Sequence, residues 1–352
     1  MSASADPSPL LDLLSRRAAA ASRLLGTLAL TYLGLLAVTF FIGRVIPVDP
    51  ALAIAGDRAP EAVLQRIRQE LGLDEPLWVQ FGVYLGKVLR GDLGTSILTS
   101  NPVAQDILKT FPATLELATV GILIGVGLGV PLGVMAAVRQ GRALDHLARV
   151  LGLLGHSVPI FWLGLMGLLL FYAQLGWVSG PGRIDVVHEF SVERITGLML
   201  VDTAWAGQWD AFGNALSHLI LPAGLLGFFS LAYISRMTRS FMLHELGKDY
   251  VLTARAKGLR ESRVVWRHAL RNAAVPLLTV VAMSYATLLE GSVLTETVFA
   301  WPGLGLYITH SLQNADMNAV LGGTLVVGTV FVGLNLLSDA LYRLLDPRTR
   351  PA

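Results

Sequence analysis

The sequence predicts an all-α integral membrane protein with six transmembrane helices, and three observations support this. First, 53% of the 352 residues are hydrophobic and only 15% are charged, whereas soluble domains carry about 25% charged residues. Second, uncharged apolar runs long enough to cross a bilayer recur along the chain. Third, lysine and arginine concentrate in alternate connecting segments. The chain has no cysteine, which excludes disulfides and thiolate chemistry.

The apolar runs define the expected spans. A spanning helix needs about 20 mostly apolar residues, because about 30 Å of hydrocarbon is crossed at 1.5 Å per residue. The third run is too long for one helix, and we expect its helix near residues 150–175. The first run has full spanning length, so we interpret it as a retained helix and not a cleaved signal peptide. The six runs are Leu24–Gly43, Leu117–Val138, Val150–Gly182, Ala211–Ser235, Asn272–Leu289 and Met317–Ser338.

The basic residues predict the orientation, because cytoplasmic loops carry an excess of lysine and arginine. With the N-terminus inside, the segments 1–23, 139–149, 236–271 and 343–352 hold 18 of the 27 basic residues. We therefore expect both termini in the cytoplasm. The expected divisions are a cytoplasmic segment 1–23, a first span 24–43, an outer helical loop 44–112, a core domain 113–343 and a cytoplasmic tail 344–352.

The outer loop 44–112 carries two amphipathic patterns. "PEAVLQRIRQELGL" places Val63, Leu64 and Ile67 on one helical face, and "DEPLWVQFGVYLGKVLRG" repeats the pattern with Gly91 as its end. Such helices lie on another surface. Two interpretations are compatible: a lid on the membrane domain, and a docking surface for an outer partner.

A basic stretch at 249–273, "DYVLTARAKGLRESRVVWRHALRNA", lies between two spans. We call residues 236–275 the elbow. The sequence of this elbow predicts two short helices, with Asp249 as the N-cap of the first and Gly258 as the left-handed residue that ends it. On the second helix Arg263 and Arg267 share one face with Arg271, which is easier to understand if an anionic partner receives them.

The apolar side chains of the elbow point to a partner as well. Val264 and Val265, with His268, form a second face, and the small residues Ala254 and Ala256 allow close approach. Three interpretations remain open: a solvated loop that attracts anionic lipid, a membrane-surface amphipathic helix, and a docking elbow for a cytoplasmic protein. The glycine break between two helices favours docking, since lipid binding does not require it.

The elbow resembles the coupling loop of ABC importer permeases, whose general pattern is EAA, three residues, Gly, nine residues and I-x-L-P. Gly258 stands at the glycine and Ala254 at the second alanine. The positions of Glu, the first Ala, Ile, Leu and Pro are occupied by Leu252, Thr253, His268, Leu270 and Arg271. Against this general pattern the match is weak.

One subfamily matches far better. "YVLTARAKGL", "RHALRNA", "IRQELGLDEPLWVQFGVYLGKVLRGDLGTSI", "PATLELA", "HLILPA" and "ETVFAWPGLG" are similar to the dipeptide/oligopeptide/nickel importer permeases nearly residue for residue. These pieces run from about residue 45 to 310. The long outer loop resembles the B-type permease of such systems.

The resemblance implies a type I permease that forms half of a translocation pore in the bacterial inner membrane. It implies four kinds of partner: a second permease subunit, two cytoplasmic ATP-binding subunits, a periplasmic or surface-anchored binding protein, and membrane lipids. No nucleic acid is expected. The implied ATPase-coupling residues are Ala254, Ala256, Gly258, Leu259, Arg263, Val264, Val265, Arg267 and His268.

The chain itself is expected to be neither an enzyme nor a cofactor protein. It contains no G-x-x-x-x-G-K-[ST] phosphate loop, so ATP and Mg²⁺ would be bound by the partner subunits. Lys248 replaces the second histidine of an H-E-x-x-H motif at His244, so no metal site is predicted. Peptides are the expected cargo, with nickel chelates, glutathione, opines and oligosaccharides as alternatives.

Three ionisable residues in or near spans are candidates for the translocation path or its outer gate: Glu290, Glu296 and His156. A solvated position in a short re-entrant segment is the alternative for the glutamates, and a hydrogen bond to a backbone carbonyl is the commoner role for the histidine.

Two other classes of protein, a secondary transporter and a membrane enzyme, fit the sequence less well. A secondary transporter would show paired intramembrane charges or inverted repeats, and neither is found in the sequence. A membrane enzyme would need His, Asp or Glu converging at one depth, and the spans hold only scattered ones.

Overall fold

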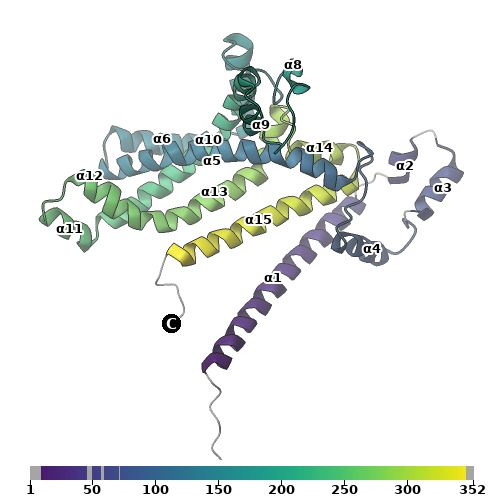
Figure 1. The fold of residues 1–352 in the computed structure, drawn as a ribbon, viewed down its shortest axis with the longest axis horizontal. Helices are drawn as coiled ribbons and strands as arrows, with labels where there is room; N and C mark the ends of the chain where they lie inside the picture. Colours follow the sequence, from purple (N-terminus) through teal and green to yellow (C-terminus); the bar gives the residue numbers. More distant parts are fainter. Residues whose placement is uncertain (1–8, 46–49, 57–58, 71, 346–352) are drawn as a thin grey trace, which may run out of the picture.

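The computed structural model describes residues 9–45, 50–56, 59–70 and 72–345. Within these ranges the regular elements are helices, which confirms the all-α prediction; the one β pairing is an isolated bridge between Thr95 and Pro102. Figure 1 shows long helices side by side, with short helices at both ends of this group and above it. The elements before α10 are α1 (Pro9–Val45), α2 (Pro50–Ala55), α3 (Glu61–Glu70), α4 (Leu77–Leu89), α5 (Val103–Val138), α6 (Ala143–Ser157), α7 (Ile160–Gly167), the π-helical η1 (Leu168–Gln174), α8 (Val186–Glu189) and α9 (Met199–Trp205). The remaining elements are α10 (Trp209–Leu246), α11 (Asp249–Ala256), α12 (Glu261–Arg263), the π-helical η2 (Val264–Ala269), α13 (Leu270–Val298), α14 (Leu304–Gln313) and α15 (Met317–Leu345).

Four helices of the described chain are long and apolar enough to cross a membrane. They are Val103–Val138, Trp209–Leu246, Glu261–Val298 and Met317–Ser338. They match the second, fourth, fifth and sixth predicted spans. The first predicted span lies in α1, whose apolar part, Leu25–Phe41, is shorter.

The third predicted span differs from the expectation of one helix near 150–175. Helix α6 ends at Ser157, and the chain bends by 100° before Ile160–Gln174 continues. Pro159 is the physical reason, because it lacks a donor N–H and disfavours helical torsions in the residue before it. Val158 accordingly has extended torsions, φ −93° and ψ 129°. The bent pair forms one broken span or a re-entrant loop.

The outer loop folds partly as expected. In α3 only Leu64 is buried among the described residues, while Val63 remains exposed and Leu71 lies outside the described residues. In α4, Tyr84 stacks on Phe40 of α1 and Phe81 packs against the same ring at a tilt, with ring centroids 5.5 and 5.4 Å from that of Phe40. Helix α4 therefore packs on α1 through an aromatic cluster. The following helix α5 runs without interruption past the expected boundary at residue 112.

The centre of the bundle is the contact between α5 and α10. The glycines of the motif "GILIGVGLGVPLG" recur every four residues and face α10 at Gly121, Gly125, Gly129 and Gly133. A Cβ at Gly133 would lie 2.5 Å from the Ser235 carbonyl oxygen, so only glycine allows the two backbones to approach this closely. Small residues at the interface are typical of membrane helix packing, and these glycines let α5 and α10 pack closely.

Candidate functional site

The elbow turn is built by Gly258. Its N–H donates to the Arg255 carbonyl (2.9 Å) and the N–H of Leu259 donates to the Ala254 carbonyl (3.3 Å). This pair of bonds with a left-handed residue, φ +75° at Gly258, is the Schellman ending of a helix. Leu259 then packs against the buried residues Val251, Ala254 and Val264. The predicted role of Gly258 in ending the first helix is confirmed.

Two details of the elbow differ from the prediction. Lys248, and not Asp249, occupies the N-cap of α11, and no side-chain capping bond is formed there. The second helix is not short: α12, η2 and α13 form one helix from Glu261 to Val298. Movement of the elbow is thereby tied directly to a spanning helix. The wide π-helical turn at 264–269 lies at this junction, and such turns are frequent at functional sites.

The apolar face expected of the elbow points inward. Val264 and Val265 are buried within the chain, Val265 against Val134, Met242 and Ala273. The expectation that these two valines face a partner is therefore wrong, because Val265 is covered by α5 and α10 and Val264 by α11. Ala254 is buried too, whereas Leu259 and His268 are partly buried.

A different set of elbow side chains is exposed. Leu252 on α11 is 56% exposed and Trp266 47% exposed. Ala256, Gly258, Arg263 and Arg267 are exposed as well. Within the described chain, no ion pair involves Arg263 or Arg267. The surface that the elbow presents thus combines one leucine, one tryptophan and unpaired guanidinium groups.

Ion pairs inside the chain brace this end of the bundle. Arg255 and Glu261 pair across the Gly258 turn at 2.6 Å. Glu245 accepts from Lys248 Nζ at 2.5 Å and from the Tyr250 hydroxyl at 2.7 Å, which fixes α11 to the end of α10. The acidic groups nearest the turn are consequently already occupied.

A second brace joins α6 to α10. The fully buried carboxylate of Asp145 accepts from Arg239 Nε (2.5 Å), Arg149 Nη2 (2.6 Å) and the backbone N–H of Gly141 (2.8 Å). Two cations on one buried carboxylate satisfy its oxygens without water. This contact was not predicted, because Asp145 and Arg239 are far apart in sequence.

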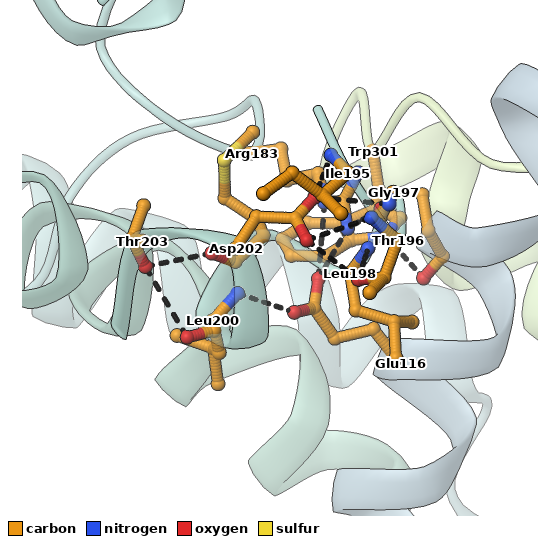
Figure 2. Close-up of polar contacts among 12 residues, drawn as sticks. Glu116, Arg183, Ile195, Thr196, Gly197, Leu198, Leu200, Asp202, Thr203 and Trp301 are labelled. Carbon is orange, nitrogen blue, oxygen red and sulfur yellow. Dashed lines mark hydrogen bonds and ion pairs between the residues drawn. The ribbon is translucent and has the colours of Figure 1, made fainter. Parts of the chain in front are cut away.

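At the opposite end of the bundle a buried ion pair holds the segment between η1 and α10. Arg183 donates to Glu116 Oε2 of α5 through Nη2 (2.6 Å) and Nε (3.0 Å), and both side chains are buried. Arg183 also donates to the Gly197 carbonyl and lies 5.8 Å from the Trp301 ring centroid. The N–H of Leu200 donates to the other Glu116 oxygen at 2.7 Å. Figure 2 shows these groups gathered beside the first turn of α9.

The loop before α9 is organised by Asp202. Its carboxylate accepts from the backbone N–H groups of Ile195, Thr196 and Gly197 and from the Thr196 hydroxyl (Figure 2). Burial alone would raise the pKa of the Asp202 carboxyl, but these hydrogen bonds outweigh it, so the pKa lies below its ordinary value. The loop is therefore held by an ionised carboxylate at neutral pH.

Glu296 lies in the interior of the protein, with 0% exposure. Its carboxylate accepts from the Thr114 hydroxyl (2.7 Å), the Ser292 hydroxyl (3.0 Å) and the N–H of Leu306 (2.9 Å). The indole of Trp301 donates to the Ala113 carbonyl at 2.9 Å. Glu296 thus ties α13, α5 and the start of α14 together, and it faces no open path in this structure.

Glu290 and His156 are the other two candidates for the translocation path. Glu290 is exposed and lines a small cavity of about 20 Å³ between α5, α13, α14 and α15. His156 lies in α6, but its side chain is outside the described residues. Of the two candidates whose side chains the structure describes, Glu290 borders an open space and Glu296 does not. Sequence reasoning missed Glu116 and Arg183, although Glu116 stands in "PATLELA" and Arg183 ends the longest uncharged run.

Two family models match this chain, one in its N-terminal part and one in the remainder. Residues 129–351 match the family described as binding-protein-dependent transport system inner membrane component. Residues 16–118 match the N-terminal part of binding-protein-dependent transport system membrane components. The chain belongs to this family of multi-pass inner-membrane permeases, whose membership implies ATPase and binding-protein partners. The chain is the permease subunit and is not itself catalytic.

Three individual relatives show which permeases of this family the chain is similar to. The chain is 46% identical to a probable D,D-dipeptide transport system permease of Escherichia coli K12, over 91% of this chain and 94% of that protein. It is 44% identical to the dipeptide transport system permease DppB of the same strain, over 93% and 97%. It is 43% identical to the di/tripeptide permease DppB of Pseudomonas aeruginosa, over 94% and 98%.

A solved structure supports the fold. A chain of the MetNI methionine ABC transporter in an inward-facing conformation matches with a TM-score of 0.51 at 18% identity, over 70% of this chain and all of that one. This likeness establishes the ABC transporter permease fold and nothing about cargo.

Proposed function

We propose that this chain forms half of the translocation pathway of an importer for dipeptides and short oligopeptides. The relatives named for dipeptide, D,D-dipeptide and di/tripeptide transport carry this proposal, because they match more than nine-tenths of the chain at 43–46% identity. ATP would be hydrolysed by two cytoplasmic subunits. A second permease subunit would complete the pathway, and an outer binding protein would deliver the cargo.

The proposed topology has six spans with both termini in the cytoplasm. It counts the apolar part of α1 and the bent pair α6–α7–η1 as one span each. The distribution of lysine and arginine supports it, since 18 of 27 lie in segments that this topology places inside. Residues 44–112 and the loop that carries Arg183 would then be outside. Single cysteines at Ser2 and Ala206 test this in a cysteine-free chain: an impermeant thiol reagent on spheroplasts should label position 206 only.

The elbow is the proposed site of ATPase coupling. Leu252, Ala256, Arg263 and Arg267 are exposed, and they lie at the junction between α11 and the helix that continues as α13. A partner bound here would push on a spanning helix directly. Gly258 and Leu259 shape the turn. Ala254 and Val264 pack α11 against the helix that follows it, Val265 packs that helix on α5 and α10, and His268 on the same helix is partly buried.

Uptake by the reconstituted system tests the function. The chain, its partner subunits and its binding protein would be placed in proteoliposomes, and uptake of a labelled dipeptide would be compared with that of a nickel chelate, glutathione and an oligosaccharide. We expect ATP- and binding-protein-dependent uptake of the dipeptide. Uptake of one of the other compounds in place of the dipeptide would contradict the proposed cargo but not the permease assignment.

A further inference from the structure

A groove lies at the elbow end of the bundle, between the last turn of α5 and the start of the helix at Glu261. Its volume is about 160 Å³. Its floor includes the apolar side chains Met135, Val138 and Trp266, and its polar end is formed by Arg139, Ser262 and Glu261. Figure 1 places α12 and the end of α5 at the same end of the molecule. The groove therefore pairs a hydrophobic surface with a polar rim.

The apolar side chains of this groove are not covered by the chain. Met135, Val138 and Trp266 are each close to half-exposed. They lie where two membrane-crossing helices end, and tryptophan is enriched at the boundary between membrane and water. An exposed apolar surface at that depth is favourable in contact with acyl chains and unfavourable in contact with water.

The charge around the groove is positive. Arg139 is exposed, and no ion pair involves it within the described part of the chain. The carboxylate of Glu261, which lines the groove, pairs with Arg255, and that of Asp145 pairs with Arg149 and Arg239. An anionic group at the rim would thus meet a guanidinium without displacing an existing pair.

We propose that this groove binds one anionic phospholipid of the surrounding membrane. The phosphate lies against the Arg139 guanidinium and the Ser262 hydroxyl, and an acyl chain lies along Met135, Val138 and Trp266. Basic pockets between membrane helices on the cytoplasmic side bind anionic headgroups in this way. Free phosphate would make no use of the apolar floor. The proposal rests on the permease being in a membrane and not on its cargo.

Quenching of Trp266 fluorescence tests the lipid contact. The complex with its ATP-binding subunits would be placed in phosphatidylcholine nanodiscs containing increasing amounts of brominated phosphatidylglycerol. The emission of Trp266 is the difference between the wild-type protein and Trp266→Phe. We expect half-maximal quenching at a several-fold lower mole fraction than with brominated phosphatidylcholine. Equal quenching by the two lipids would overturn the proposal, and so would no quenching, which would mean that a protein partner covers the groove.

Two arginine variants separate a site from diffuse attraction. Arg139→Gln should weaken the phosphatidylglycerol effect about fivefold, the amount that one basic residue contributes at an anionic membrane surface. Arg142→Gln is the control, because Arg142 is exposed in the same turn but does not line the groove. It should change the effect less than about twofold. Equal weakening by the two variants would show diffuse surface attraction and overturn the proposal. Dipeptide uptake, measured in parallel, tests the cargo separately.

Discussion

The two ends of the bundle differ in how their charged side chains are buried and paired. At the α9 end, Glu116, Arg183 and Glu296 are buried, and each has several hydrogen-bonding partners inside the chain. At the elbow end, Arg263 and Arg267 are exposed, and the described chain offers them no acidic partner. Charges satisfied internally hold a structure together, whereas unpaired exposed charges are available to another molecule. The α9 end is therefore braced by buried charges. The elbow end has ion-pair braces of its own, but it also presents exposed guanidinium groups, which we propose bind a partner.

Breaking the buried pair should have the largest effect. Arg183→Met leaves the Glu116 carboxylate buried without its cation, which costs about 3–5 kcal/mol in comparable pairs. Thermal unfolding in detergent measures this loss. The control is Arg194→Met, since Arg194 pairs with Glu189 on the surface of the same segment at 3.8 Å, and surface pairs contribute at most about 1 kcal/mol. Similar losses for the two variants would contradict the distinction between buried and exposed charge.

Two glutamates on one helix give the next largest contrast. Glu296→Ala leaves the Thr114 hydroxyl and the N–H of Leu306 without their acceptor, whereas the Ser292 hydroxyl keeps the Leu289 carbonyl. Each stranded group costs about 1–3 kcal/mol. We expect a total loss near 3 kcal/mol of unfolding free energy. Glu290→Ala should change the unfolding free energy by less than about 0.5 kcal/mol, because its side chain is exposed. Equal stability of the two variants would show that Glu296 is not a brace.

A smaller effect is expected at the elbow turn. Gly258→Ala places a side chain at φ +75°, which costs about 1–2 kcal/mol. Gly247→Ala is the matched control, because Gly247 has φ −85° and no close contact at its Cβ position. We expect only Gly258→Ala to lower the unfolding temperature and the retention of the ATP-binding subunits. If the two alanine variants behave alike, the left-handed turn is not required.

The smallest expected effect is the loss of stability of the loop before α9 at acid pH. The pKa of Asp202 lies below its ordinary value, so its stabilising contribution is present above the unfolded value of about 3.9 and is lost as the pH falls through the folded value. The protection of residues 195–203 against hydrogen exchange, relative to the intrinsic exchange rate at each pH, should stay high down to about pH 4 and fall below it. In Asp202→Asn the protection should be lower at pH 7 and should lose this pH dependence. A wild-type loss of protection already between pH 5 and 6 would contradict this.

Local signals in the sequence predicted local features of the structure. Hydropathy located four of the spans, and the position of Gly258 after an alanine-rich helix predicted its left-handed turn. Proline was less informative: Pro131, Pro222 and Pro276 stay inside helices, whereas the chain bends by 100° at Pro159. Long packed contacts along α5, α10 and α13 override the local preference of the first three.

Contacts between distant residues could not be predicted from the pattern alone. Glu116 and Arg183 are 67 positions apart, and only the folded chain shows that they pair. Periodicity showed that Val264 and Val265 form an apolar face, but an apolar face does not state whether it packs on its own chain or on a partner. Burial decided this, and it moved the expected contact surface to the exposed Leu252.

Retention of the ATP-binding subunits by a Leu252→Asp permease tests the central claim most directly. Leu252 is 56% exposed on α11, so the substitution should leave the unfolding temperature unchanged while adding a charge to the proposed interface. The control is Val186→Asp, an apolar site at the opposite end that is 71% exposed. We predict that Leu252→Asp co-purifies with at most about a tenth of the wild-type amount of ATP-binding subunits, because a charge stranded at a buried contact costs at least about 1.4 kcal/mol, and that Val186→Asp retains them fully. Full retention by Leu252→Asp, with dipeptide uptake at the wild-type rate, would contradict the elbow as the coupling surface.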